Sequence, residues 1–195
     1  LIIENNNNEV TKKIDTQIDK VENFVEQVLY YSKSDNVEKD YIIKELNLKD
    51  VVTNTVKRNY RDFISKNIKL ELEDIDNIIY SDQKWVEFIL NQVISNAIKY
   101  SKTKDAKVHI SSKNIENAVI LTIKDNGVGI CEKDINRVFE KGFTGENGRI
   151  FGKSTGIGLY LCDKLCNKLG LVLAIESDLN IGTVVRIKFP KSLIH

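Results

Sequence analysis

The sequence predicts an α+β protein, a two-layer α/β sandwich in which a mixed, mostly antiparallel sheet carries helices on one face, preceded by one long helix. Three observations support this fold class. Apolar residues recur at intervals of three and four over residues 10–31, alternating segments interspersed with helical ones follow, and most of the 10 glycines fall within residues 126–157. A helix period, a strand period and a glycine-rich connection thus occupy different parts of the chain.

The first region is a long amphipathic helix. A lone helix of this length cannot bury its wide apolar stripe by itself. The stripe consists of Val10, Ile14, Ile18, Val21, Phe24, Val25, Val28 and Leu29. We expect a helical hairpin of which this is one helix, or pairing between subunits, and packing on the chain's own C-terminal part is the alternative. We expect a helical region at 1–40 and an α+β domain at 41–195.

The remaining elements follow from periodicity and punctuation. Spacing of three and four predicts helices, one capped by Ser81 or Asp82 and another ended at Gly170. In the helix expected at 51–64, one face is shared by Val52, Val56, Tyr60 and Phe63. Period-two alternation predicts strands, the last two joined as a hairpin. The expected helices cover residues 51–64, 85–100, 133–139 and 156–169, and the expected strands cover 69–72, 78–80, 108–112, 118–124, 171–177 and 183–189.

Composition excludes several classes of function. Hydrophobic residues make up 42% and charged residues 29%, which suits a soluble globular protein, and the net charge of +1 gives no reason to expect a nucleic-acid partner. No run of 18 apolar residues is present, so no spanning helix is expected. Cys131, Cys162 and Cys166 lack the spacing of a zinc site, and we expect free thiols in a reducing compartment.

Three segments carry residues suited to a nucleotide. In NQVISNAIKYS (91–101), helical spacing puts Gln92, Asn96, Lys99 and Tyr100 on one face. The adjoining flank is apolar and would face the core. An amide oxygen is a hard ligand suited to Mg²⁺, and a lysine reaches phosphate oxygens. A solvated helix face would show the same row, so this segment alone leaves both interpretations open.

The second segment is KDNGVGI (124–130), in which a strand ends in Asp125 and two spaced glycines follow. Glycine lets the backbone approach a ligand closely, and a carboxylate accepts a hydrogen bond from an exocyclic amine such as that of adenine. An ordinary Asp-Asn-Gly turn is the alternative.

The third segment is FGKSTGIGLYLC (151–162). Its Gly152-Lys153-Ser154 imitates the end of a P-loop, but the first glycine of that motif would fall at Asn147. Instead, Gly156 and Gly158 lead into a helix whose first N–H groups form a ready anion site. The preceding VFEKGFTGENGRI has the composition of a mobile loop with phenylalanine anchors that closes over a ligand.

The ordered set NQVISNAIKYS, DNGVGI, VFEKGFTG, GKSTGIGLYL and IGTVVRIKF resembles the N, G1, F, G2 and G3 boxes of sensor histidine kinases. These kinases are members of the ATPase superfamily shared with gyrase, the Hsp90 chaperones and MutL. The match covers about residues 80–190. It is similar in form to the small Gram-positive, antibiotic-sensing kinases that work beside peptide-antibiotic transporters in the membrane.

The resemblance implies roles for individual residues. Asn96 would bind the Mg²⁺ of ATP–Mg²⁺, Lys99 would lie beside the phosphates, and Asp125 would read the adenine amine with the help of a water near Thr183. Asn96 and Lys99 are the implied catalytic residues. The implied ATP-binding residues are Asn96, Lys99, Tyr100, Asp125, Gly127, Gly129, Ile130, Phe139, Arg149, Lys153, Thr155, Gly156, Ile157, Gly158, Leu159 and Thr183. At the position one turn before Asn96, many relatives carry an asparagine, whereas this chain has Gln92.

One expected feature of a histidine kinase is absent from this sequence. Neither His109, in an expected strand, nor His195, the last residue, fits the phosphate-accepting histidine of the dimerisation helices. The helix at 10–31 resembles the second helix of that hairpin. We therefore expect the cytoplasmic portion of a homodimeric, membrane-anchored kinase whose acceptor histidine lies upstream, and whose product is relayed to a response-regulator aspartate.

Two other functions remain open. An ATP-driven clamp of the MutL or Hsp90 type needs a glutamate base one turn before the metal asparagine, where this chain has Gln92, and Glu87 lies more than two turns upstream. A signalling module that has lost catalysis is the third candidate, against which the intact Asn96 and Asp125 argue.

Overall fold

The computed structural model describes residues 11, 18, 25, 41–150 and 154–191. The chain forms two compact units, residues 1–39 and 40–195. In the first unit Thr11, Ile18 and Val25 are helical, and the rest of the expected helix at 10–31 lies outside the described residues. No helix in the described part of the chain is long and apolar enough to cross a membrane.

The second unit is built on a five-stranded sheet in the order β2-β4-β5-β7-β6. The β2–β4 pair is parallel and the other three pairs are antiparallel, so the sheet is mixed and mostly antiparallel, as predicted. The strands are β2 (Lys69–Glu73), β4 (Lys107–Ile115), β5 (Ala118–Asp125), β6 (Val172–Asp178) and β7 (Gly182–Pro190). The hairpin expected at the end of the chain is the β6–β7 pair.

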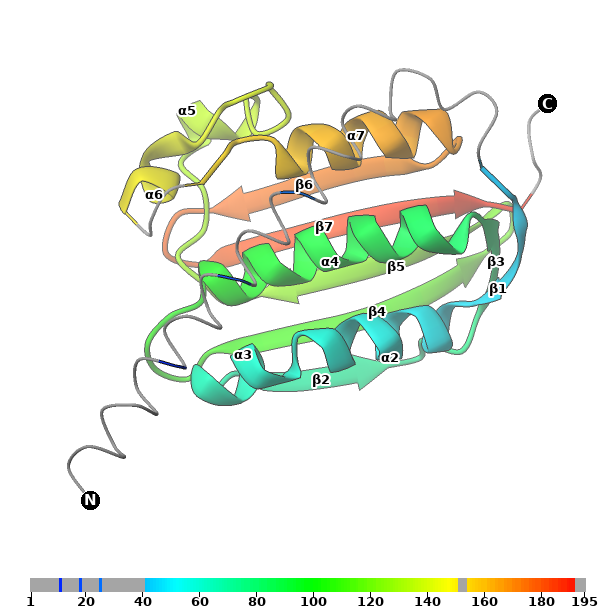
Figure 1. Ribbon diagram of the computed structural model, residues 1–195, viewed down its shortest axis with the longest axis horizontal. Helices are drawn as coiled ribbons and strands as arrows, with labels where there is room; N and C mark the ends of the chain where they lie inside the picture. The colour runs from blue at the N-terminus through cyan, green and yellow to red at the C-terminus, as the bar shows by residue number, and fades with distance from the viewer. Residues whose placement is uncertain (1–10, 12–17, 19–24, 26–40, 151–153, 192–195) are drawn as a thin grey trace. The chain divides into compact units, whose positions relative to one another are not determined.

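Helices α2 (Leu48–Arg58), α4 (Gln83–Lys99) and α7 (Gly158–Lys168) lie across one face of this sheet (Figure 1). The inward positions of β4 and β5 alternate as Val108, Ile110 and Leu121, Ile123, each no more than 1% exposed. On α4 the predicted core flank is buried throughout, namely Val86, Leu90, Val93, Ile94 and Ala97. The two-layer prediction is thereby confirmed.

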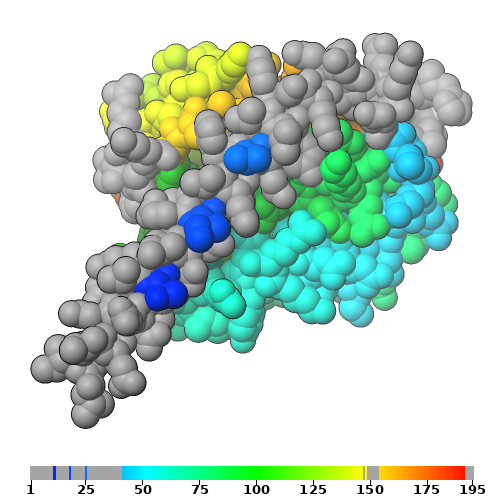
Figure 2. All heavy atoms as spheres, in the orientation of Figure 1, coloured from blue at the N-terminus to red at the C-terminus, as the bar shows by residue number. Residues whose placement is uncertain are grey.

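The predicted helix at 51–64 is two helices, α2 and α3 (Tyr60–Ser65). The chain breaks at Asn59, whose φ of −94° and ψ of 5° are not helical. Because this break changes the helix direction, the prediction that Tyr60 shares a face with Val52 and Phe63 is wrong: those two side chains are buried and Tyr60 is 61% exposed. The α2–α3 segment, coloured cyan, forms an edge of the surface in Figure 2.

Three further differences concern short elements. The strand expected at 78–80 is β3 (Ile78–Ser81), which pairs with the unpredicted β1 (Lys44–Asn47) in a separate two-stranded sheet. The helix expected at 133–139 is only α5 (Glu132–Ile135), followed by turns. The segment expected to be an irregular loop contains α6 (Gly145–Ile150). These segments are too short for apolar periodicity to define.

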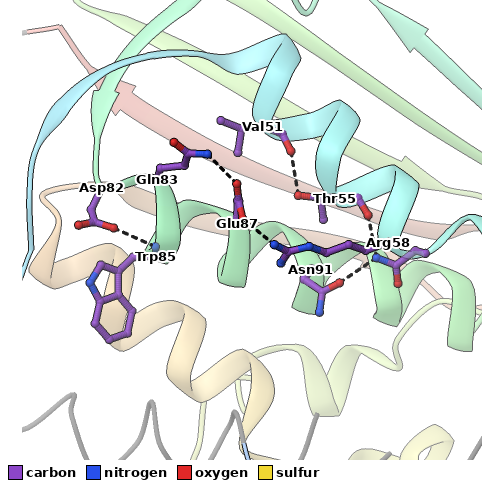
Figure 3. Close-up of polar contacts among 9 residues, drawn as sticks. Val51, Thr55, Arg58, Asp82, Gln83, Trp85, Glu87 and Asn91 are labelled. Carbon is purple, nitrogen blue, oxygen red and sulfur yellow. Dashed lines mark hydrogen bonds and ion pairs between the residues drawn. The ribbon is translucent and has the colours of Figure 1, made fainter. Parts of the chain in front are cut away.

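Helix α4 is fixed at its start and along its side. The Asp82 carboxylate caps it, accepting from Trp85 N at 3.2 Å and from Ile42 N at 2.8 Å. Beside α2, the Arg58 guanidinium lies 3.0 Å from the Glu87 carboxylate, which also accepts from the side-chain amide of Gln83 at 2.9 Å (Figure 3). These contacts hold one helix in place, and that helix carries the polar row of the candidate site.

Candidate functional site

Five segments meet at one end of the sheet. The C-terminal end of α4, the end of β5, the β6–β7 turn, the start of α7 and the α5–α6 region all lie at the left of Figure 1. The sequence separates these segments by up to about half of the chain. Their assembly follows from the antiparallel pairing of β5 with β7 and of β7 with β6, which brings the end of β5 beside the β6–β7 turn.

The polar row of α4 is partly buried. Asn96 is half-buried, one turn before the helix ends at Lys99, and Gln92 is only 7% exposed. A helix face that served only solvation would be exposed, so the burial of this row favours a binding role over the solvated-face interpretation.

The last turn of α4 contacts the glycine-rich segment before α7. The Lys99 ammonium donates to Ser154 Oγ at 2.6 Å, and the Tyr100 hydroxyl lies 3.1 Å from the same oxygen. The Lys99 nitrogen also lies 5.4 Å from the centroid of the Tyr100 ring. An ammonium and a phenol thus converge on one small hydroxyl.

Asp125 ends β5 with its carboxylate held by backbone amides. Its Oδ1 accepts from Gly127 N at 2.8 Å and from Thr183 N at 3.3 Å. Burial raises the pKa of this carboxyl, and the two amide hydrogen bonds and the charge of Lys102 oppose that rise. Because both backbone bonds use Oδ1, Oδ2 is the oxygen through which Asp125 can accept from a ligand amine.

The two glycines after Asp125 are required by contact. A Cβ at Gly127 would lie 2.4 Å from the Tyr100 carbonyl oxygen, and one at Gly129 would lie 2.0 Å from that of Asp178. Gly129 also has a φ of +67°, which L side chains rarely adopt. The loop therefore packs directly on the backbone of Tyr100, the residue that follows α4, on one side and on that of β6 on the other.

The segment between β5 and α7 is fixed by contacts of its own. Gly142 N donates to Gly156 O at 2.9 Å, and Gly156 has a φ of +65°. Lys133 and Glu146 form an ion pair that joins α5 to α6, and the Arg137 guanidinium lies 4.4 Å from the centroid of the Phe143 ring.

The other predicted ATP-binding residues surround the start of α7 or precede it. Ile157 N-caps α7 without a side-chain bond, its N–H lies 3.3 Å from the Thr155 hydroxyl, and Gly158 is the first helical residue. Leu159 is half-buried, as is Phe139 in the turns that follow α5. Arg149 belongs to α6, but its side chain, like all of Lys153, lies outside the described residues.

Two serines that the sequence analysis gave no role have well-defined contacts here. Ser154 is the shared partner of the α4 side chains. Ser177, at the end of β6, accepts from Ile130 N at 2.9 Å, donates to Gly182 O at 2.8 Å and lies 2.9 Å from the Thr183 hydroxyl. A serine at a strand end carries no sequence signal of this role, because the partners come from distant segments.

A magnesium ion bound to nucleotide is compatible with this site. Within the described part of the chain no group of three or more His, Cys, Asp or Glu side chains could hold a metal ion by itself. Magnesium keeps waters and takes few protein ligands when it is bound with substrate phosphates. The side-chain amide of Asn96 is half-buried and lies one turn before Lys99, and its oxygen is a metal ligand of the type that such an ion takes.

The fold and the geometry define a nucleotide-binding domain in which a helix, a strand-end carboxylate and a glycine-rich helix start meet. The family described as histidine kinase-, DNA gyrase B- and HSP90-like ATPase matches residues 81–193, and the chain belongs to it. Within this family, the relatives that match over 97% of the chain are sensor histidine kinases.

Sensor histidine kinase YxdK of Bacillus subtilis (strain 168) is 37% identical over 191 residues, which are 97% of this chain and 58% of the relative. Sensor protein kinase GraS of Staphylococcus aureus (strain MRSA252) is 34% identical over 97% of this chain and 55% of its own length. The chain thus spans little more than half of these relatives. The predicted resemblance to sensor histidine kinases is confirmed.

Among solved structures, histidine kinase ThkA in complex with the response regulator TrrA has the same fold. Its TM-score is 0.71 at 22% identity, with coverage of 92% of this chain and 49% of that chain. At this identity the similarity concerns the fold alone, namely the sheet and the helices that cover it.

Proposed function

We propose that this domain binds ATP–Mg²⁺ and transfers the γ-phosphoryl group to a histidine outside residues 1–195, for relay to the aspartate of a response regulator. The observation that carries the proposal is the meeting of Asn96 and Lys99 with Asp125 at one end of the sheet. One group reads the base and the others receive the phosphates, at opposite ends of one ligand.

Each group has a distinct proposed role. Asp125 accepts the adenine amine through Oδ2, and Lys99 leaves Ser154 to contact phosphate oxygens. The Asn96 amide oxygen would hold the magnesium ion, which would neutralise charge on the phosphates when bound. Phosphoryl transfer depends on positioning and charge neutralisation more than on proton abstraction, so no general base is required of this chain.

His109 is unsuited to accept the phosphoryl group. Its Nε2 lies 2.8 Å from the Glu73 carboxylate, and it alternates along β4 with the buried Val108 and Ile110. It therefore lies on the sheet face opposite the helices, whereas Asp125 pairs with Val108 and lies on the helix side. An acceptor on another helix remains the proposal.

The clamp-ATPase alternative loses support from the structure. Glu87 is bound to Arg58 and Gln83 beside α2, and it precedes Asn96 by nine residues, about 13 Å along a helix. Such a carboxylate is badly placed to activate water at the phosphates.

We further propose that the whole protein is a membrane-anchored homodimer. The amphipathic stripe of residues 10–31 and the incomplete coverage of the relatives support a dimerisation hairpin completed by an upstream helix. An associated peptide-antibiotic transporter is proposed on the family resemblance alone.

Calorimetric titration with ATP–Mg²⁺ tests the central proposal. The wild-type chain should bind, Asp125→Asn should lose binding, and Asn96→Ala should lose the magnesium dependence. Labelled ATP should leave no acid-labile phosphate on this chain. Absence of wild-type binding would favour the non-catalytic module, and acid-labile label on the chain would place the acceptor within it.

A further inference from the structure

Three backbone segments near Asp125 are tied into a closed ring of hydrogen bonds, which we call the frame. Val128 N donates to Tyr100 O at 3.0 Å, Asn180 N donates to Val128 O at 2.7 Å, and the Lys102 ammonium donates to Asn180 O at 2.9 Å. Tyr100 and Lys102 are two residues apart, so the ring starts and ends at the same place after α4. Lys102 supplies its one side-chain bond.

The frame determines the position of the Asp125 loop. Residues 127–129 lie between the Tyr100 carbonyl and the β6–β7 turn without space for a Cβ at either glycine. The start of β7, directly after this turn, contacts Asp125, because Thr183 N donates to Oδ1 and a Cβ at Gly182 would lie 2.1 Å from Asp125 O. A shift of the turn away from α4 would therefore move the partners of the carboxylate.

The turn needs such a tie. Asn180 has a φ of +64°, a left-handed conformation at the tip, and its neighbours Leu179 and Ile181 are 53% and 68% exposed. Exposed apolar side chains do not anchor a turn by burial. Two hydrogen bonds of Asn180, both within the frame, hold its tip to the Asp125 loop and to Lys102.

We infer that Lys102 is a positioning residue for base recognition: it closes the frame and holds the β6–β7 turn against the Asp125 loop. The inference rests on the proposed function, since it deepens the role of Asp125 as the adenine-reading group. Electrostatics acts in the same direction: burial raises the pKa of Asp125, and the positive charge of Lys102 opposes that rise. Lys102 thereby favours the ionised carboxylate that accepts from an amine.

The test compares ATP, ADP and AMP binding to the full chain by titration. Lys102→Met should weaken all three by the same factor, about three- to tenfold, because the base end is common to them. Lys102→Arg keeps a charged donor and should restore most of the affinity. Lys104→Met, which removes an exposed lysine of the same loop, is the matched control and should change nothing.

A direct phosphate contact predicts a different pattern. Lys99→Met should weaken ATP strongly and AMP little, and the same graded pattern for Lys102→Met would overturn the positioning role. Unchanged affinities in Lys102→Met would overturn it as well, provided that the wild type binds and Asp125→Asn does not. If the wild type binds none of the three nucleotides, the proposed function fails together with the inference.

Discussion

The Lys99 ammonium and the Ser154 hydroxyl lie 2.6 Å apart, although 55 residues separate them in the sequence. This bond joins the end of the polar helix α4 to the glycine-rich segment that leads into α7. Tyr100 adds a second hydroxyl contact to the same oxygen. Ser154 thus ties the segment before α7 to α4, and under the proposed function the Lys99 ammonium would exchange this hydroxyl for a phosphate oxygen.

Loss of this tie should loosen the segment without unfolding the domain. In Ser154→Ala the hydrogen bond from the Lys99 ammonium to this hydroxyl is lost, and a hydrogen bond to a charged group contributes about 1.5–3 kcal/mol. We expect limited proteolysis between Gly142 and Gly156 to accelerate about tenfold in nucleotide-free protein. Ser154→Thr keeps the hydroxyl and is the control; equal cleavage rates in the wild type and the alanine variant would show that the bond does not restrain the segment.

The ionised Asp125 carboxylate should lower the free energy of unfolding of the nucleotide-free protein. Its pKa is raised in the folded state, chiefly by burial, so the folded protein binds its proton more tightly than the unfolded chain does. Stability from this group is therefore greatest at low pH and falls as pH rises from the unfolded pKa through the folded pKa. Asp125→Asn should raise the midpoint of thermal unfolding at neutral pH and flatten this pH dependence.

Nucleotide binding should show the opposite preference. If ionised Asp125 accepts from the adenine amine, ATP affinity falls as pH decreases through the raised pKa. Calorimetric titrations over a pH series would measure this, with unfolding midpoints from the same samples. An Asp125→Asn variant that is no more stable than the wild type would contradict the assigned cost of burial.

The sequence predicted well what depends on long periodic segments. Helix α4 extends over 83–99 against the predicted 85–100, and its capping residue Asp82 was one of two candidates. The strands β4 to β7 agree because alternation reports one buried face. At the break, by contrast, the Asn59 side-chain amide donates to Asn91 Oδ1 at 2.8 Å on another helix. No local pattern encodes such a partner.

The candidate site divides in the same way. Asn96, Lys99 and Asp125 were predicted because their residue types and order match known boxes. Ser177 and Lys102 were not, since each acts on backbone atoms of a distant segment, 47 residues away for the Ile130 amide and 78 for the Asn180 carbonyl. Contacts to backbone leave no complementary residue type for sequence reasoning to detect.

Two glycines with nearly the same φ allow the steric cost of an added Cβ to be measured separately from the cost of a left-handed backbone. Gly129 has a φ of +67° and Gly170 of +68°, but a Cβ at Gly129 would lie 2.0 Å from Asp178 O, whereas nothing lies within 4 Å at Gly170. Gly170→Ala should cost about 1–2 kcal/mol, the penalty of a left-handed L residue. Gly129→Ala should cost about 2 kcal/mol more, because the backbone of β6 must move. Denaturant unfolding of both variants gives the difference; equal losses would mean that the loop adjusts freely.

The thiols should differ in reactivity as their burial does. Cys162 and Cys166 are buried on α7, and burial raises the pKa of Cys166 to about 12 and that of Cys162 well above its ordinary value. Cys131 is partly exposed before α5. Because the thiolate is the reactive form, a thiol reagent at neutral pH should titrate one group per native chain and all three after denaturation. Cys131→Ser should abolish the native reaction, and any fast native labelling that persists in this variant would show that α7 opens on the time scale of the assay.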